Sequence, residues 1–301
     1  MSAASFLFQR RLSQLVKSER LRTLYILLVV YPAAWIDYFA HRRLFENIRA
    51  YVTFIGYPRS GHSLVGALLN AHPQALIAHE LFATRYFRLG FRRQQVLALL
   101  LRRDVDFTER GRVNAGYSYD VPGGFQGVHD CLLVVGDKKA GGTIWSLRER
   151  PGLLGVMRRR MAMPMRFVHS VRNPYDNIAT MSRREQRSVA YTINRYRKLA
   201  VTCQQVMERL EPEELLQQWH EDFVEDVEGH MSQLCAFVGL EADPAFLAAC
   251  DAVVFESPKL SRDSVIWTAE DVEQVEALCR ELPFLARYAG SPVTIGRQAA
   301  A

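Results

Sequence analysis

The chain has 301 residues, of which 49% are hydrophobic and 23% are charged, a composition typical of a globular protein with a sizeable core. It contains no internal repeat and no long low-complexity tract, which excludes fibrous and largely disordered classes. The net charge of +6 favours an anionic ligand or an acidic membrane face as partner, and we expect no nucleic-acid partner. None of the five cysteines forms a C-x-x-C pair, which predicts free thiols, no zinc or redox motif, and a reducing, cytoplasmic location: Cys131, Cys203, Cys235, Cys250 and Cys279.

The N-terminal region is basic and then apolar. Five basic side chains lie within residues 9–22, and an apolar run follows from Thr23 to Ile36. The run is shorter than the ~20 residues of a membrane span and contains Pro32. We predict helices over 5–22 and 38–50, in a helical hairpin that packs on the protein or lies in a membrane interface, with peripheral membrane contact through residues 1–45. A transmembrane span is the alternative.

Residues 51–295 show strands alternating with helices, which predicts an α/β fold with a mostly parallel sheet, preceded by an N-terminal extension over residues 1–50. Strands are expected at 51–55, 75–78, 131–135, 165–171 and 214–219. Helices are expected at 62–70, 82–103, 143–162, 187–210, 223–250 and 270–282, with a further helix after residue 176. Residues 104–130 are rich in glycine and predict a long loop that serves as a lid or binding segment.

The segment Gly56-Tyr-Pro-Arg-Ser-Gly-His-Ser63 joins the first strand to the first helix of this region. Its spacing is that of a phosphate-binding P-loop, with His62 in place of the lysine. In such a loop, backbone N–H groups and the helix N-terminus converge on an anion. We therefore expect the anion to be bound by Arg59, Ser60, Gly61, His62 and Ser63, with Arg59 supplying the positive charge.

A second motif follows the strand at 165–171. Arg172 lies at the carboxyl end of this strand, and Thr180 lies two turns into the next helix. Ligands of open α/β sheets bind at the carboxyl ends of the strands. Arg172 is therefore a candidate to bind a second phosphate.

Together, Pro58-Arg-Ser-Gly61, Arg172-Asn-Pro-Tyr-Asp176 and Thr180 resemble the sulfotransferases that use 3′-phosphoadenosine 5′-phosphosulfate. The resemblance extends over about 51–290 and includes Trp219-His-Glu-Asp222 and Phe237-Val-Gly-Leu240. It implies a P-loop-type mostly parallel sheet flanked by helices. It also implies in-line transfer of a sulfuryl group from this donor to an acceptor hydroxyl or amine, with no metal.

The resemblance also assigns roles to individual residues. Arg59 and the loop would bind the phosphosulfate, and Arg172 and Thr180 the 3′-phosphate. Glu80 matches the general base of tyrosylprotein and several bacterial sulfotransferases, with neighbouring His79 as the competing candidate.

Two further segments follow from the same resemblance. Lys138, with Lys139 as the alternative, would stabilise the leaving oxygen. Ser257, Lys259 and Arg262 belong to a segment similar to the one that closes over the donor.

Two other functions stay open from the sequence. One is a P-loop kinase or NTPase with a degenerate Walker A loop, in which Leu132–Asp137 would imitate a Walker B strand. The other is a membrane-associated binding module without catalytic activity. The acceptor of a sulfotransferase would be a small molecule, a carbohydrate or a lipid, bound in part by the basic and aromatic side chains of residues 85–130.

Overall fold

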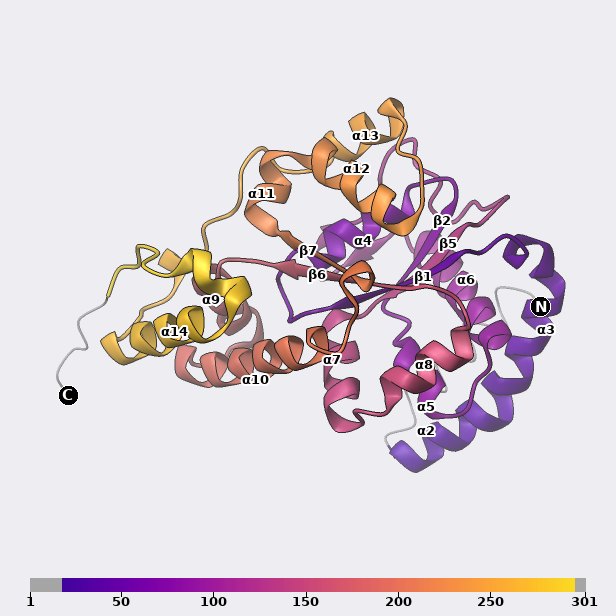
Figure 1. Cartoon of the computed structure of the whole chain (residues 1–301), viewed down its shortest axis with the longest axis horizontal. Helices are drawn as coiled ribbons and strands as arrows, with labels where there is room; N and C mark the ends of the chain where they lie inside the picture. Colours follow the sequence, from indigo (N-terminus) through magenta and orange to yellow (C-terminus); the bar gives the residue numbers. More distant parts are fainter. Residues whose placement is uncertain (1–17, 296–301) are drawn as a thin grey trace.

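A five-stranded parallel sheet forms the centre of the computed structural model, which describes residues 18–295 (Figure 1). Its strands follow the order β2-β5-β1-β6-β7. Their bounds are β1 Ala50–Ile55, β2 Ala75–His79, β5 Val134–Lys138, β6 Met165–Val171 and β7 Leu215–Trp219. The predicted α/β fold with a mostly parallel sheet is confirmed.

Helices cover both faces of the sheet, so that all strands except the edge strand β7 are almost continuously buried (Figure 1). Val52 and Phe54 of β1 pack in one apolar cluster with Leu68 of the helix that follows β1. Tyr51 and Ile55 point to the opposite face and pack in the second cluster. The helices are α4 His62–Asn70, α5 Ala83–Arg88, α6 Arg93–Glu109, α7 Ala140–Glu149, α8 Leu153–Met161, α9 Pro174–Glu185, α10 Val189–Met207, α11 His220–Glu225, α12 Val227–Val238, α13 Pro244–Asp251 and α14 Ala269–Glu281. The shorter 3-10 helices are η3 Pro212–Glu214, η4 Arg262–Ser264 and η5 Pro283–Tyr288.

The strand predicted at 131–135 lies at 134–138 instead. The prediction followed the apolar run and therefore ended the strand too early. Asp137 and Lys138 are polar, yet both are buried in the sheet. Asp137 pairs in register with Ala78 of β2 and Thr53 of β1. Polar groups at such a position must find partners inside the fold, and both do so in the site described below.

The segment predicted as a helix over 82–103 and a loop over 104–130 is also different. The helix is broken into α5 and α6 near Gly90, whose φ of +94° favours glycine. The second helix then continues to Glu109, because the buried carboxylate of Asp104 is satisfied by Asn70 and Arg112. The loop therefore begins at residue 110, and it contains a two-stranded hairpin, β3 Val113–Asn114 and β4 Tyr117–Ser118.

The N-terminal region forms one continuous helix within the described residues, so the predicted hairpin is wrong, and the helix predicted at 38–50 is the end of this helix and stops at residue 45. It consists of α2 Glu19–Tyr25, a π-helical turn η1 Ile26–Val30, α3 Tyr31–His41 and a 3-10 turn η2 Arg42–Phe45. In the π-helical turn, N–H groups bond five residues back, as Tyr31 does to Ile26, and the helix continues through Pro32. The part of the predicted first helix before residue 18 lies outside the described residues.

By length and composition, the helix from Glu19 to Phe45 is sufficient to cross a membrane. Its C-terminal half packs against α6 instead: Gln95 Nε2 donates to the carbonyl oxygen of Tyr31 at 2.9 Å, and Arg102 pairs with Asp37 at 3.2 Å. The predicted division of the chain near residue 50 stays a prediction.

Candidate functional site

The loop between β1 and α4 has the backbone conformation of an anion cradle. Three of its residues have positive φ angles, +138° at Gly56, +70° at Arg59 and +92° at Gly61. The hydroxyl of Ser60 is buried and donates to the carbonyl oxygen of Tyr57 at 3.1 Å, which fixes the loop from inside. The helix α4 then begins at residue 62, so the positive end of its dipole faces the loop.

His62 contributes shape to the cradle and no charge. Its Nδ1 lies 3.1 Å from Ser60 Oγ, and the ring is buried. Burial, together with the nearby Lys138, lowers the pKa of His62 to about 3, so the ring is neutral at pH 7. Arg59, which is half-buried, is then the cation that the loop itself supplies.

A residue that the sequence reasoning missed, His220, packs against the cradle. It is the first residue of α11, directly after β7. A Cβ atom on Gly61 would lie 2.6 Å from its Nδ1, so the glycine is needed here for space as well as for backbone conformation. Burial, with Arg172 nearby, lowers the pKa of His220 to about 4.

Arg172 brings the two predicted motifs together. Its guanidinium donates to the carbonyl oxygen of Arg59 at 3.3 Å and lies 3.5 Å from the hydroxyl of Thr180. It also donates to the carbonyl oxygen of Lys259 at 2.6 Å and approaches Ser261 Oγ at 3.4 Å. The structure thus joins the cradle, the start of α9 and the segment around residue 260 in one cluster. The Lys259 side chain is exposed, and its backbone makes this contact.

Two residues of α9 hold this arrangement. Asn177 Nδ2 donates to the carbonyl oxygen of Pro58 in the cradle at 2.8 Å. The buried carboxylate of Asp176 accepts from the backbone N–H groups of Ser261 and Arg262, at 2.6 and 2.8 Å, and from the Arg262 guanidinium at 2.6 Å. Arg262, which was expected to touch the donor, therefore has its guanidinium paired with Asp176.

Beside the cradle, Glu80 lies between two lysines. Lys138 Nζ is 3.2 Å from Glu80 Oε1 and 2.9 Å from Ser63 Oγ, so it links the cradle to the carboxylate. Lys139 Nζ donates to Glu80 Oε2 at 2.7 Å. Burial alone would raise the pKa of Glu80, but the two lysines outweigh it and hold this pKa below its usual range. Burial lowers the pKa of Lys138 to about 8, although Glu80 opposes the shift.

His79, the competing base, is engaged by its own neighbours. Its Nε2 lies 2.9 Å from Asn114 Nδ2, which donates to it, and 3.4 Å from Lys138 Nζ. Its ring stacks on Phe107 with the centroids 4.2 Å apart. Burial and Lys138 lower the pKa of His79 to about 2, which makes it a neutral hydrogen-bond acceptor.

The backbone that carries Glu80 is strained, and a second residue that the sequence reasoning did not place in this site holds it. The φ angles are +62° at Glu80 and +66° at Phe82, a region that costs non-glycine residues about 1–3 kcal/mol each. Asp137 accepts from the backbone N–H of Leu81 at 2.9 Å and from that of Ala83 at 2.7 Å. Burial raises the pKa of Asp137 to about 6 despite these two amides. The available signal was an acidic residue at the end of an apolar strand.

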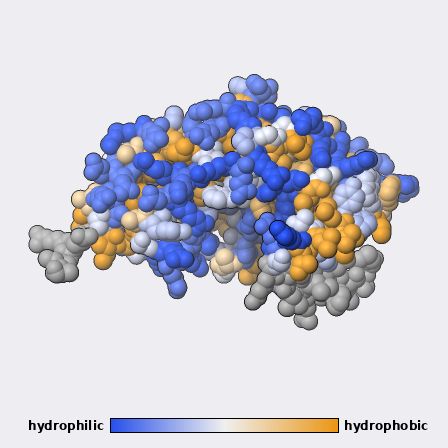
Figure 2. Space-filling model, turned by 90° about the horizontal axis from the view of Figure 1, so that it is seen from below, coloured by the Kyte–Doolittle hydropathy of each residue, from blue (hydrophilic) through white to orange (hydrophobic). Residues whose placement is uncertain are grey.

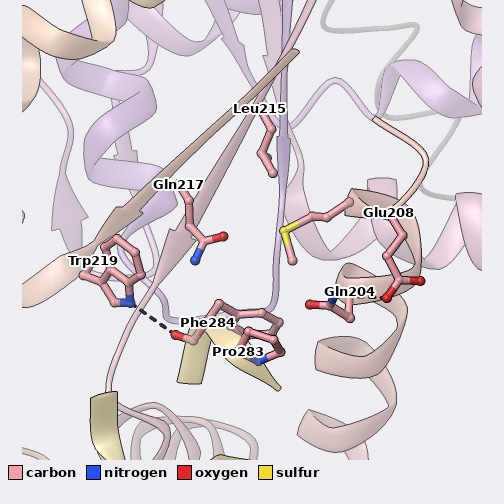
Figure 3. Close-up of a pocket in the computed structure, with 8 residues that line it drawn as sticks. Gln204, Glu208, Leu215, Gln217, Trp219, Pro283 and Phe284 are labelled. Atoms are coloured by element: carbon pink, nitrogen blue, oxygen red, sulfur yellow. Dashed lines mark hydrogen bonds between the residues drawn. The ribbon is translucent and has the colours of Figure 1, made fainter. Parts of the chain in front are cut away.

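A groove of about 400 Å³ lies between β7, α10 and the start of η5 (Figure 3). Its lining is mostly apolar, and Trp219 Nε1 donates across one end to the carbonyl oxygen of Phe284 at 3.2 Å. None of the predicted site residues lines it. Charged groups converge at the strand ends instead, which makes the cluster around Arg172 and Glu80 the stronger candidate.

No family profile and no curated protein matches the chain. Among solved structures, sulfotransferase STF1 from Mycobacterium tuberculosis aligns over 93% of this chain and 86% of its own, with a TM-score of 0.50 and 13% identity. The sulfotransferase domain of the Synechococcus PCC 7002 olefin synthase covers 77% of this chain and 95% of its own, at a TM-score of 0.48 and 18% identity. A mouse sulfotransferase complexed with PAP covers 82% of this chain and 96% of its own, with a TM-score of 0.46 and 12% identity. Sequence identities this low establish similarity of fold only. The chain has the fold of the sulfotransferases, as its two motifs predicted.

Proposed function

We propose that the protein is a sulfotransferase that transfers the sulfuryl group of 3′-phosphoadenosine 5′-phosphosulfate to an acceptor hydroxyl or amine. The observation that carries this proposal is the position of Arg172. Its guanidinium lies 3.3 Å from the carbonyl oxygen of Arg59 in the cradle and 3.5 Å from Thr180 Oγ1. Two anion-binding groups side by side fit a donor with two separate phosphate positions.

The donor would be bound by groups already in place. The backbone N–H groups of residues 60–63 and the Arg59 side chain would bind the 5′-phosphosulfate. Arg172 and the hydroxyl of Thr180 would bind the 3′-phosphate, which would take the place of the Lys259 carbonyl as hydrogen-bond acceptor. A single phosphate with one sulfuryl group carries less charge than a triphosphate, which accounts for a loop with Arg59 and no P-loop lysine.

For the chemical step, we propose Glu80 as the base. Its carboxylate removes the proton of the acceptor while the acceptor oxygen or nitrogen forms a bond to sulfur, and the bond from sulfur to the phosphate oxygen breaks. Lys138 then donates a hydrogen bond to that leaving oxygen, which its contact with Ser63 in the cradle supports. When Lys138 turns to the donor, Glu80 loses one cationic partner, and its pKa rises towards that of a useful base.

Three observations favour these assignments over the alternatives. The His79 ring nitrogen accepts a hydrogen bond from Asn114, so its lone pair is already engaged. For a kinase, neutral His62 replaces the cation that would reach the triphosphate. The Asp137 carboxylate, in the position of a Walker B aspartate, is occupied by two backbone amides.

Calorimetry with adenosine 3′,5′-bisphosphate tests the proposal. We expect the full chain to bind it without added magnesium, and Arg172→Ala to weaken binding roughly 10- to 100-fold, the value of a hydrogen-bonded charge pair. Arg197→Ala, at a half-exposed site on α10, is the matched control and should bind as the wild type does. No binding by the wild type, or equal binding by Arg172→Ala, would contradict the proposal. Binding of ATP that requires magnesium would favour a kinase instead.

The acceptor is the remaining part of the reaction. We propose a small molecule, a carbohydrate or a lipid, bound near Glu80 and the segment 110–130 that packs beside it through Asn114 and His79. Transfer of labelled sulfate to the components of a metabolite extract identifies it.

A further inference from the structure

The N-terminal helix exposes an apolar stripe along its length. The large side chains on this stripe are half to two-thirds exposed: Leu21 57%, Leu24 51%, Leu28 66%, Ile36 62% and Phe39 60%. Figure 2 shows hydrophobic surface at the right of the molecule, the end at which Figure 1 places α2 and α3. Contiguous exposed apolar surface of this kind marks an interaction site.

The opposite side of the same helix is fixed to the protein. Ala33 and Ala34 are buried, and the contacts of Tyr31 with Gln95 and of Asp37 with Arg102 bind α3 to α6. Residues 19–30, which precede this contact, span only about 18 Å at 1.5 Å per residue. The hydrocarbon core of a bilayer is about 30 Å thick, so residues 19–30 by themselves are too short to cross it while α3 stays on α6.

Basic side chains flank the stripe at both ends. Arg20 is exposed before it, and Arg42 and Arg43 are exposed after it. The sequence adds Arg10, Arg11 and Lys17 before the helix. Basic side chains beside an apolar stripe attract a helix to the surface of an anionic membrane.

We propose that this protein docks on anionic phospholipid membranes through the apolar stripe of the helix 19–45, which lies in the plane of the interface. Leu24, Leu28, Ile36 and Phe39 enter the boundary between headgroups and acyl chains. Arg20, Arg42 and Arg43 contact the lipid phosphates. This proposal is independent of the proposed transfer reaction, because none of these residues belongs to the cluster around Arg172 and Glu80.

A second copy of the chain fits the stripe less well than lipid does. If two such helices paired antiparallel, Arg20 of one would face Arg42 and Arg43 of the other. If they paired parallel, each basic end of one helix would face the same basic end of the other. Glu19 and Glu46 are also exposed at these ends, but the three arginines outnumber them, so either pairing brings net positive charge together, whereas anionic lipid neutralises it.

Vesicle flotation of the full chain tests the proposal. We expect the protein to float with vesicles that contain roughly one-third phosphatidylserine, and much less with pure phosphatidylcholine, since each basic residue near the surface strengthens binding about fivefold. The triple variant Leu28→Ser, Ile36→Ser, Phe39→Ser should lose roughly tenfold or more of the binding to anionic vesicles, because about half of each side chain would have been inserted. Its affinity for adenosine 3′,5′-bisphosphate should equal that of the wild type, which shows that it is folded.

The matched control replaces three exposed apolar residues elsewhere, Val128→Ser, Phe255→Ser and Ile266→Ser, and should float as the wild type does. Absence of flotation, or equal flotation of the stripe variant, would overturn the proposal. A dimer in light scattering that the stripe variant dissociates would overturn it in favour of a second copy. Retention of the full chain in membranes at alkaline pH would overturn the interfacial position in favour of a span.

Discussion

Asp137 determines where the Glu80 carboxylate lies, although it is not expected to touch a substrate. Its two oxygens accept the N–H groups of Leu81 and Ala83, on either side of the strained residue Phe82. Asp137 is 2% exposed. It precedes Lys138 in β5, and Lys138 is the cation that contacts Glu80. One buried acid thus orders the turn that carries Glu80, the proposed base.

The variant Asp137→Asn tests this positioning role. One side-chain oxygen becomes an NH₂ group that faces a backbone N–H, so one amide is left unpaired at a cost of about 1–3 kcal/mol. The strained turn then relaxes and Glu80 moves. We expect transfer to fall roughly 10- to 100-fold in kcat, with the affinity for adenosine 3′,5′-bisphosphate unchanged. Asp251→Asn, on an exposed position of α13, is the control. Loss of donor affinity in parallel with kcat would show general damage to the site and contradict a positioning role.

The sequence indicated the residues of this site that belong to short contiguous motifs. The structure brings Arg59, Arg172 and Thr180 together, as the two motifs implied. The roles of Asp137 and His220 were not predictable in the same way, because their partners lie on strands and turns that are distant in the sequence and are fixed only by strand order.

The turn from β1 to α4 is the element on which the proposed donor binding would depend most closely. Gly61 has a φ of +92°, and a Cβ there would lie 2.6 Å from His220 Nδ1, the start of α11. The cradle is therefore shaped by two elements, α4 after β1 and α11 after β7, which pack in the same apolar cluster.

The pair of variants Gly61→Ala and Gly61→Ala/His220→Ala separates these two constraints. We expect Gly61→Ala to weaken binding of adenosine 3′,5′-bisphosphate by roughly tenfold or more, because both the backbone strain and the overlap with the ring act against the cradle. Removal of the ring relieves only the overlap, so the double variant should recover part of the affinity. Calorimetry measures both. Full recovery would assign the effect to overlap alone, and wild-type binding by Gly61→Ala would contradict the importance of this turn.

The elements that were predicted correctly and those that were not differ in one physical respect. β6 lies at 165–171 and α4 at 62–70, as predicted, because apolar periodicity and local stop signals define both. The predictions for β5 and for the end of α6 were wrong, because in both cases the element continues through a buried acidic residue. Asp137 and Asp104 have tertiary partners, which periodicity does not report.

At the scale of the whole molecule, Asp104 connects the half of the sheet that carries Glu80 to the segment 110–130. Its buried carboxylate accepts from Asn70 of α4 at 2.7 Å and from Arg112 at 3.1 Å. It also accepts from the backbone N–H of Gly127 at 3.1 Å and lies 3.0 Å from His129 Nε2. One carboxylate thus fixes this long segment at Arg112, Gly127 and His129.

The variant Asp104→Asn should therefore destabilise the fold more than Asp137→Asn or Gly61→Ala does. It leaves the Arg112 guanidinium, which is 2% exposed, without its ionic partner, and breaking a buried pair costs about 3–5 kcal/mol.

Burial raises the pKa of Asp104, but His129, Arg112 and Asn70 outweigh it and hold the pKa below its usual value. A lowered pKa means that the carboxylate stabilises the fold above the pKa of an unfolded aspartate, about 3.9, and that this stability is lost as the pH falls through the lower, folded value. Denaturant unfolding at pH 7 and at acidic pH should show a large deficit at pH 7 that narrows on acidification, whereas the exposed control Asp120→Asn should follow the wild type at both. A deficit that stays constant with pH would place the cost in lost packing and would contradict a stabilising charge at Asp104.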